Sequence, residues 1–317
     1  MTRDVQDAVT TLSQGERPEP PRGPIAGLFY GFARGARPVD EPACAFFTDT
    51  SICIGCKACE VACKQWNQLP VDDVRWSGDS YDNTFELSAT SWRHVKFIED
   101  FPAIAGPAAG ALPAPALDDI EAILAEPRTA RWLMLSDQCK HCDDAPCHDA
   151  CPSGAIVYTE YEGVFIQSDI CVGCSSCVAA CPFGVITRSE IDGHAHKCTM
   201  CLDRLRDGLP PACAQACPTG SIAFGEHREM KEQARERLLA VRERGYDGAR
   251  LYGDEPSSAY TELHNMYLLL DEPQAYGLPE QPVSPRLVRL TGDYLRAGAV
   301  LAVAVAVVVV LLLTGGF

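Results

Sequence analysis

The sequence has little positive charge. It contains 27 Lys and Arg against 43 Asp and Glu, which gives a formal net charge of −16, and no block of basic residues stands out. Proteins that bind nucleic acid need basic patches to neutralise phosphates, so we exclude this class. We also expect no signal peptide, because no apolar segment follows Arg3, and the chain has no twin-arginine pair.

Several signatures of catalysis are also missing. The sequence has no glycine-rich phosphate loop, no nucleophile beside a general base and no pair of carboxylates in a suitable setting. We therefore predict no catalytic site on this chain itself.

Cysteine, in contrast, is abundant, with 17 residues in a chain of 317. All except Cys44 fall into four runs of four. Disulfide frameworks are typical of small secreted domains and would not require groups of four. The grouping predicts metal clusters, and we interpret Cys44 as a small buried hydrophobic residue.

The third run sets the pattern, with the sequence Cys171-Val-Gly-Cys-Ser-Ser-Cys177-Val-Ala-Ala-Cys181-Pro182. This spacing is typical of the [4Fe-4S] loop of bacterial ferredoxins, in which the fourth cysteine ligates the neighbouring cluster. Gly173 allows the loop to adopt a positive φ. The first run has the same spacing, and the second and fourth have wider gaps. Each run alone is also compatible with a structural zinc site, but four runs, three of them ending in Cys-Pro, favour iron–sulfur clusters.

The runs must pair if each fourth cysteine crosses to a neighbouring cluster. The second and third runs are adjacent and joined by a predicted hairpin at residues 155–168, so they form one pair, and the first and fourth runs form the other. The predicted ligand sets are quartet A (Cys53, Cys56, Cys59 and Cys217), quartet B (Cys63, Cys198, Cys201 and Cys213), quartet C (Cys139, Cys142, Cys147 and Cys181) and quartet D (Cys151, Cys171, Cys174 and Cys177).

The predicted fold is α+β, with two ferredoxin-like units, one inserted in the other, and a C-terminal transmembrane helix. Strands are expected at residues 91–97 and 131–135, a solvated helix at 226–244, a mostly irregular stretch at 246–285 and a surface insertion at 101–116. The predicted parts are an extended arm at 1–43, a first unit at 44–138 and 182–225, a second unit at 139–181, a C-terminal helix and irregular segment at 226–290, and an anchor at 291–317.

The predicted anchor contains residues 297–313, none of which has a polar side chain. At about 1.5 Å per residue this helix spans most of a hydrocarbon core of roughly 30 Å. A buried core helix or strand is the alternative. The segment has no histidine, so it offers no histidine ligands to a haem.

Beyond the cysteines, several segments carry a family resemblance. They include Asp49-Thr-Ser-Ile-Cys-Ile-Gly-Cys-Lys-Ala-Cys59 and residues 87–92, 197–204, 217–220 and 276–280. The sequence resembles the four-cluster iron–sulfur subunits of membrane-associated molybdenum or tungsten oxidoreductases, and within them the beta subunits of respiratory formate dehydrogenase.

The resemblance implies an electron wire. Formate would be oxidised at a molybdopterin centre in a large partner subunit, and electrons would pass through four [4Fe-4S] clusters to a membrane cytochrome b and quinone. Related nitrate reductase subunits have Trp at the position of Cys174, so this cysteine implies four [4Fe-4S] clusters and no three-iron centre. The chain itself would carry neither haem nor molybdopterin. The alternative is the iron–sulfur subunit of a membrane hydrogenase or a sulfur-compound reductase.

The side of the membrane stays open. Formate dehydrogenase beta subunits usually face outward. Yet Arg286, Arg289 and Arg296 precede the anchor and no Lys or Arg follows it, which by the positive-inside rule predicts a cytoplasmic globular part.

Two histidines lie within the second run. His141 and His148 would be able to donate hydrogen bonds to cluster sulfur, but we interpret them as solvated spacers.

Overall fold

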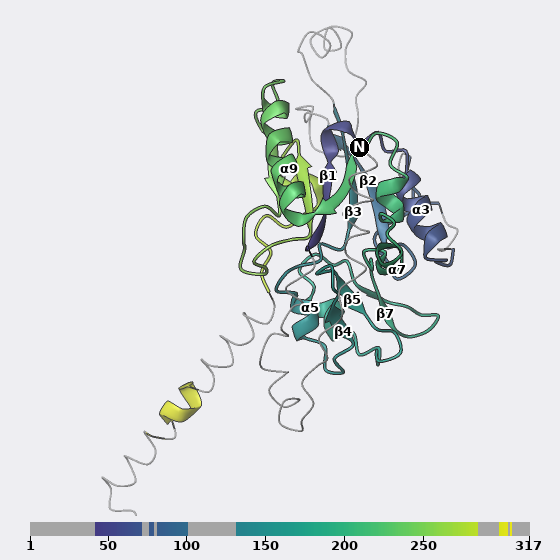
Figure 1. Ribbon diagram of the computed structural model, residues 1–317. Helices are drawn as coiled ribbons and strands as arrows, with labels where there is room; N and C mark the ends of the chain where they lie inside the picture. The colour runs from purple at the N-terminus through teal and green to yellow at the C-terminus, as the bar shows by residue number, and fades with distance from the viewer. Residues whose placement is uncertain are drawn as a thin grey trace, which may run out of the picture.

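The computed structural model describes residues 42–71, 76–78, 81–100, 131–284, 298–303 and 305. Figure 1 shows a mixed α/β molecule in which helix α9 (His227–Arg242) lies along a sheet near one end and a small hairpin unit lies at the other. The predicted insertion at 101–116, nearly all of the predicted arm and most of the predicted anchor lie outside the described residues.

A four-stranded sheet has the order β8 (Ile222–Glu226), β1 (Cys44–Asp49), β10 (Asn265–Leu269), β9 (Arg250–Tyr252). Strand β1 pairs antiparallel with β8 and parallel with β10. Its side chains alternate: Phe46 packs with Cys59 and Cys213, whereas Phe47 on the opposite face packs with residues of α9. Because both faces are covered, β1 is buried along its whole length.

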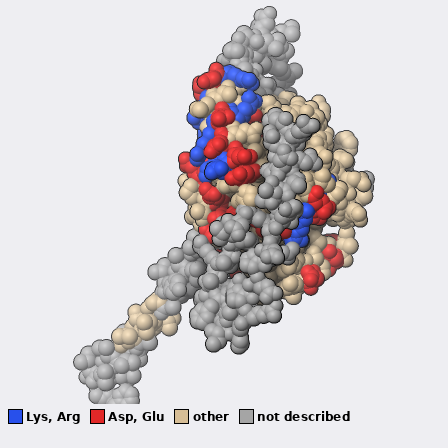
Figure 2. All heavy atoms as spheres, viewed as in Figure 1, with Lys and Arg blue, Asp and Glu red and all other residues tan. Residues whose placement is uncertain are grey.

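Helix α9 confirms the helix predicted at 226–244. Its apolar residues Met230, Ala234 and Val241 pack on the sheet, and charged residues form its outer face, where Arg235 pairs with Asp254 at 3.3 Å. Figure 2 shows basic and acidic side chains intermixed over this side of the molecule. The charges therefore belong to a solvated helix face.

The two strands predicted around the insertion are confirmed as β2 (Arg93–Asp100) and β3 (Arg131–Gln138), which pair antiparallel along their whole length. Arg93 lies opposite Gln138 at the inner end of this ribbon. The ribbon therefore brings polar side chains of both strands to the cysteine-rich centre.

The predicted hairpin between the second and third runs is confirmed as β4 (Ile156–Tyr158) and β5 (Val164–Ile166). Around it, α5 (Pro146–Asp149) packs against α6 (Ser176–Ala180), and β6 (Thr187–Arg188) pairs with β7 (Ala195–His196). The outer part repeats this arrangement, because α3 (Ala58–Trp66) packs against α8 (Ala212–Gln215). Short helices also occur at η2 (Thr50–Ile52), α7 (Leu202–Arg206) and η3 (Pro273–Tyr276).

The segment expected to be mostly irregular contributes two strands, β9 and β10, to the sheet, and β10 lies next to β1. It also reaches the second cysteine run. Asp143 N–H donates to the Glu262 carbonyl oxygen at 3.0 Å, and the backbones of Cys142 and Leu263 form an isolated antiparallel β-bridge. The segment after residue 226 thus continues the sheet of the first unit and connects it to the second.

Near the C-terminus, residues 298–303 are helical and exposed. Within the part of the protein that the structure describes, no helix is both long and apolar enough to cross a membrane.

Candidate metal centres

The first and third cysteine runs adopt the same backbone conformation. Gly55 has φ +64° and Gly173 φ +65°, and two residues later Lys57 and Ser175 have φ 59° and 62°, directly before α3 and α6. A Cβ on Gly173 would lie 2.1 Å from the carbonyl oxygen of Gly193. Glycine is therefore required here both by the positive φ and by the lack of space.

Quartets C and D each surround one small cavity. The four cysteines of quartet C line a cavity together with apolar residues such as Val164 and Ile186. The four of quartet D line another, with Ile156 and Ile166 in its wall. Neither wall contains a carboxylate or an imidazole among the residues that line it, so the donors to each cavity are thiols.

The cysteines of quartets A and B are brought together from the two ends of the first unit. Burial raises the pKa of Cys63, and the sulfurs of the other three members of quartet B raise it further. In quartet A, burial raises the pKa of Cys53, and Cys217 and Cys56 add to this effect. Cysteines of the first and fourth runs, about 140 residues apart in the sequence, are thus neighbours in space, as the predicted pairing requires.

Neighbouring sulfurs also connect the quartets in a line. Burial raises the pKa of Cys59 in quartet A to about 11, and Cys213 of quartet B contributes to the rise. Burial raises the pKa of Cys198 to about 12, with Cys139 of quartet C among its neighbours.

The third link joins quartets C and D. Burial raises the pKa of Cys147 in quartet C above its ordinary value, and Cys177 of quartet D adds to it. These neighbouring pairs connect the predicted quartets in the order A, B, C, D.

Exposure differs along this line. All four cysteines of quartet B are buried, as are three of quartet C, whereas Cys56 of quartet A and Cys174 of quartet D are exposed. The two ends of the line therefore reach the surface and the middle does not.

The donor set fits iron–sulfur clusters. Four thiols that are buried together would repel one another as thiolates, and burial accordingly raises the pKa of several of them. Bound metal removes this conflict, because its positive charge deprotonates the thiols that ligate it. Sulfur-only donors in apolar surroundings suit iron–sulfur clusters and zinc, the two kinds of centre expected from the spacing.

Buried cations accompany the cysteines. Arg93 donates from Nη1 to Ser136 Oγ at 2.8 Å. Lys197 donates to the carbonyl oxygens of Cys198 and Val164, and Lys140 pairs with Asp137. Lys140 and Lys197 are each next to a cysteine in the sequence, and this position could have indicated that they lie beside the metal centres. Arg93 lies on a strand far from any cysteine in the sequence, and nothing local indicated its role.

The two histidines of the second run differ. His148 is exposed and lies 3.4 Å from Asp149, as expected of a solvated spacer. For His141 this interpretation is wrong, because the ring is fully buried and its Nδ1 accepts a hydrogen bond from Val164 N–H at 3.1 Å. The loop is covered by the strand-forming segment around Leu263, which the local sequence did not reveal.

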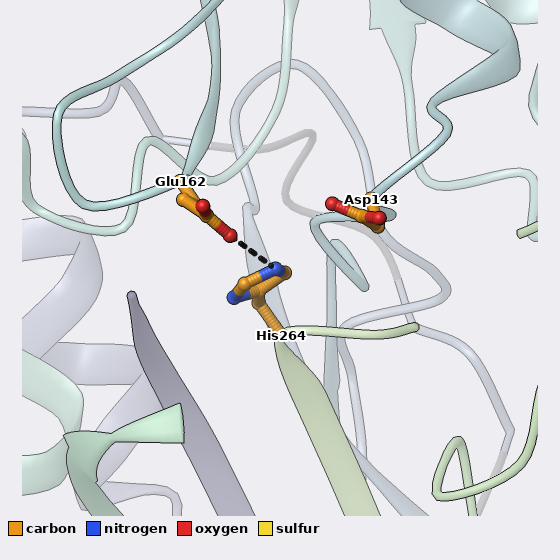
Figure 3. A group of neighbouring side chains, drawn as sticks. All are labelled: Asp143, Glu162 and His264. Atoms are coloured by element: carbon orange, nitrogen blue, oxygen red, sulfur yellow. Dashed lines mark ion pairs between the residues drawn. The ribbon is translucent and has the colours of Figure 1, made fainter. Parts of the chain in front are cut away.

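A different group of side chains lies at the meeting point of three segments. Figure 3 shows His264, the residue directly before β10, between Glu162 of the β4–β5 turn and Asp143 of the second run. The imidazole is held on both sides, since Nδ1 lies 2.9 Å from the Cys44 carbonyl oxygen and Nε2 lies 3.4 Å from Glu162. We assign this group a structural role, because it ties the sheet to the second unit.

Comparison with known proteins agrees with this geometry. A family model for a 4Fe-4S dicluster domain matches residues 130–227. The sequence is 39% identical over 238 residues to the iron–sulfur subunit of the nitrate-inducible formate dehydrogenase of Escherichia coli K12, and the match covers 74% of this chain and 71% of that protein.

Two further relatives are informative. The sequence is 37% identical to the formate dehydrogenase iron–sulfur subunit of Haemophilus influenzae, over 80% of this chain and 74% of that protein. It is 31% identical to the B subunit of the anaerobic dimethyl sulfoxide reductase of Escherichia coli K12, over 59% of this chain and 76% of that protein.

Proposed function

This protein belongs to the iron–sulfur subunits of formate dehydrogenase, and we propose that it conducts electrons through four [4Fe-4S] clusters held by quartets A, B, C and D. The observation that carries the proposal is the exposure of the four groups of cysteines: quartets A and D each have an exposed member, and quartets B and C are largely buried. A conductor between two partners needs this arrangement, whereas a metal site that only stabilises a fold does not.

Each bound cluster would supply a centre that accepts and releases one electron. The residues of the protein hold and insulate these centres. Burial of quartet B and most of quartet C excludes water from the middle of the line. The exposed cysteines, Cys56 and Cys174, place the two end sites within reach of other subunits.

The two ends suit two partners. We infer that one faces a large catalytic subunit with a molybdopterin centre, of molybdenum or tungsten, where formate is oxidised. The other faces a membrane cytochrome b that reduces quinone. Both partners are inferred from the family to which the protein belongs.

We further propose that residues 297–313 attach the subunit to the lipid bilayer. The helical stretch at 298–303 supports this, because Val300, Leu301 and Val303 are 70%, 66% and 64% exposed. Large exposed apolar side chains side by side favour a lipid or protein partner over water. A variant that ends at Arg296 should leave the membrane fraction when the whole complex is fractionated, and retention at the wild-type level would contradict the anchor.

The alternative is a subunit of a sulfur-compound reductase, and the similarity to the dimethyl sulfoxide reductase subunit supports it. The deciding experiment is purification of the intact complex followed by an assay of formate-dependent dye reduction. Activity with a sulfur compound or with hydrogen, and none with formate, would overturn our assignment.

Metal analysis of the same preparation tests the centres themselves. We expect about sixteen iron and about sixteen acid-labile sulfide for each copy of this chain, four of each per cluster. About four zinc and no iron would show that the quartets are structural sites.

A further inference from the structure

Arg93 occupies an unusual place for a guanidinium. It is the first residue of β2 and only 2% exposed. Its guanidinium carbon lies 5.5 Å from the centre of the Phe46 ring, which covers one of its faces. A permanent charge so deeply buried is expensive unless groups of opposite charge surround it.

The groups around Arg93 belong to two different quartets. Arg93 Nη1 donates to Ser136 Oγ at 2.8 Å, and that oxygen lies 3.2 Å from Cys59 Sγ of quartet A. Burial by itself would lower the pKa of Arg93, but Cys213, Cys59 and Cys198 raise it. Two of these three sulfurs belong to quartet B, and Arg93 lines one cavity together with Cys63, another member of that quartet. The guanidinium therefore lies at the junction of the two sites.

Arg93 has hydrogen-bond donors that no described protein atom accepts. These donors are Nε and Nη2. Lys140, in contrast, is neutralised by Asp137. Lys197 also faces cysteine sulfurs, but it donates to two carbonyl oxygens. Arg93 is therefore a cation whose remaining donors and whose charge are available to sulfur.

We propose that Arg93 is a fixed positive charge shared by the centres of quartets A and B, and that it raises the reduction potential of both. The proposal rests on the proposed function, since it requires redox-active clusters at these sites. An added electron makes a cluster more negative, so a neighbouring cation stabilises the reduced form of whichever of the two holds the electron. Because a guanidinium does not deprotonate in proteins, an electron passes this junction without taking up a proton at Arg93.

The test is a redox titration of the purified complex followed by EPR, with each signal assigned through cysteine-to-serine variants, one per quartet. We expect Arg93→Gln to lower the potentials of the clusters of quartets A and B and to leave those of quartets C and D unchanged. At a fixed potential, we expect the ratio of oxidised to reduced cluster to rise about tenfold, which is about 59 mV for a one-electron centre.

Two variants serve as controls. Arg235→Gln removes the same charge from a side chain that is 59% exposed on α9 and should move no potential. Arg93→Lys keeps the charge and should leave the potentials of both clusters close to wild type. Equal shifts of all four potentials, no shift at full iron content, or the same fall in Arg93→Lys as in Arg93→Gln would each overturn the proposal.

If Arg93→Gln loses iron, Ser136→Ala replaces it as the test. This change removes the hydroxyl that lies between Arg93 and Cys59, and should lower the potential of the quartet A cluster alone. No shift there, or an equal shift of all clusters, would overturn the proposal. Absence of iron from the wild-type complex would instead refute the proposed function, so the two failures are distinguishable.

Discussion

The inner and outer quartets are built from the same ligand but lie in different surroundings. All of quartet B and three of the four cysteines of quartet C are buried, and Arg93, Lys140 and Lys197 beside them are themselves buried. Quartets A and D have exposed members, Cys56 and Cys174, in loops whose glycines have positive φ. The inner sites are thus part of the hydrophobic core, and the outer sites are loops attached to it.

Removal of a cysteine should therefore destabilise the protein more at an inner quartet than at an outer one. An inner cysteine balances buried cations and packs against core residues, so its removal affects the fold as well as the cluster. An outer cysteine contributes mainly to its own cluster.

The largest effect is expected for Cys198→Ser in quartet B. Its loss weakens the compensation of Arg93 and Lys197, and an uncompensated buried charge costs about 3–5 kcal/mol. We expect loss of iron beyond that of one cluster, a large fall in the melting temperature and no electron transfer from formate to quinone. Iron analysis and thermal unfolding of the purified complex measure this. A variant with wild-type melting temperature would show that the inner sites are not part of the core.

Cys174→Ser in quartet D is the matched outer variant. Because Cys174 is exposed, we expect about four iron to be lost, one cluster's content, with little change in the melting temperature. Transfer to quinone should fall strongly. If both variants lower the melting temperature equally, the distinction between inner and outer quartets is wrong.

Gly173→Ala tests the outer loop itself. The new methyl group would meet the Gly193 carbonyl oxygen at 2.1 Å in addition to the strain of φ +65°. Gly184→Ala is the control, since Gly184 has φ +64° and nothing within 4 Å of the added Cβ. We expect the control to cost about 1–2 kcal/mol from backbone strain alone, and Gly173→Ala to cost more and to release the cluster of quartet D. Equal unfolding free energies for the two variants would show that the loop yields to the methyl group.

The outer and inner sites also differ in how far the sequence predicted them. Local spacing predicted the loops, the β4–β5 hairpin and helix α9, because the positive φ of Gly173 and the periodicity of α9 are local properties. Arg93 and His264 were not predicted as neighbours of the second and fourth runs, because strand pairing brings them there from distant segments. Strand β10 was missed for a related reason: its apolar residues Met266-Tyr-Leu-Leu269 are covered on both faces and show no alternation.

The smallest effect is expected beside quartet A at the half-buried Asp82, which accepts hydrogen bonds from Lys57 and, at 2.6 Å, from His94 Nε2. Burial raises the pKa of Asp82, but the hydrogen bonds from Lys57 and His94 outweigh it and lower the pKa below its ordinary value of 3.8. A lowered pKa in the folded state contributes stability above the unfolded pKa, and this stability is lost as the pH falls through the folded value.

Asp82→Asn should therefore lower the melting temperature by a few degrees at most, and Asp82 should add no pH dependence to this difference between about pH 6 and about pH 9. Thermal unfolding of the two complexes across this range measures the difference, and iron analysis should show all four clusters retained. Loss of the quartet A cluster in Asp82→Asn would mean that this outer site depends on the ion pairs of Asp82 as strongly as quartet B depends on its buried cations.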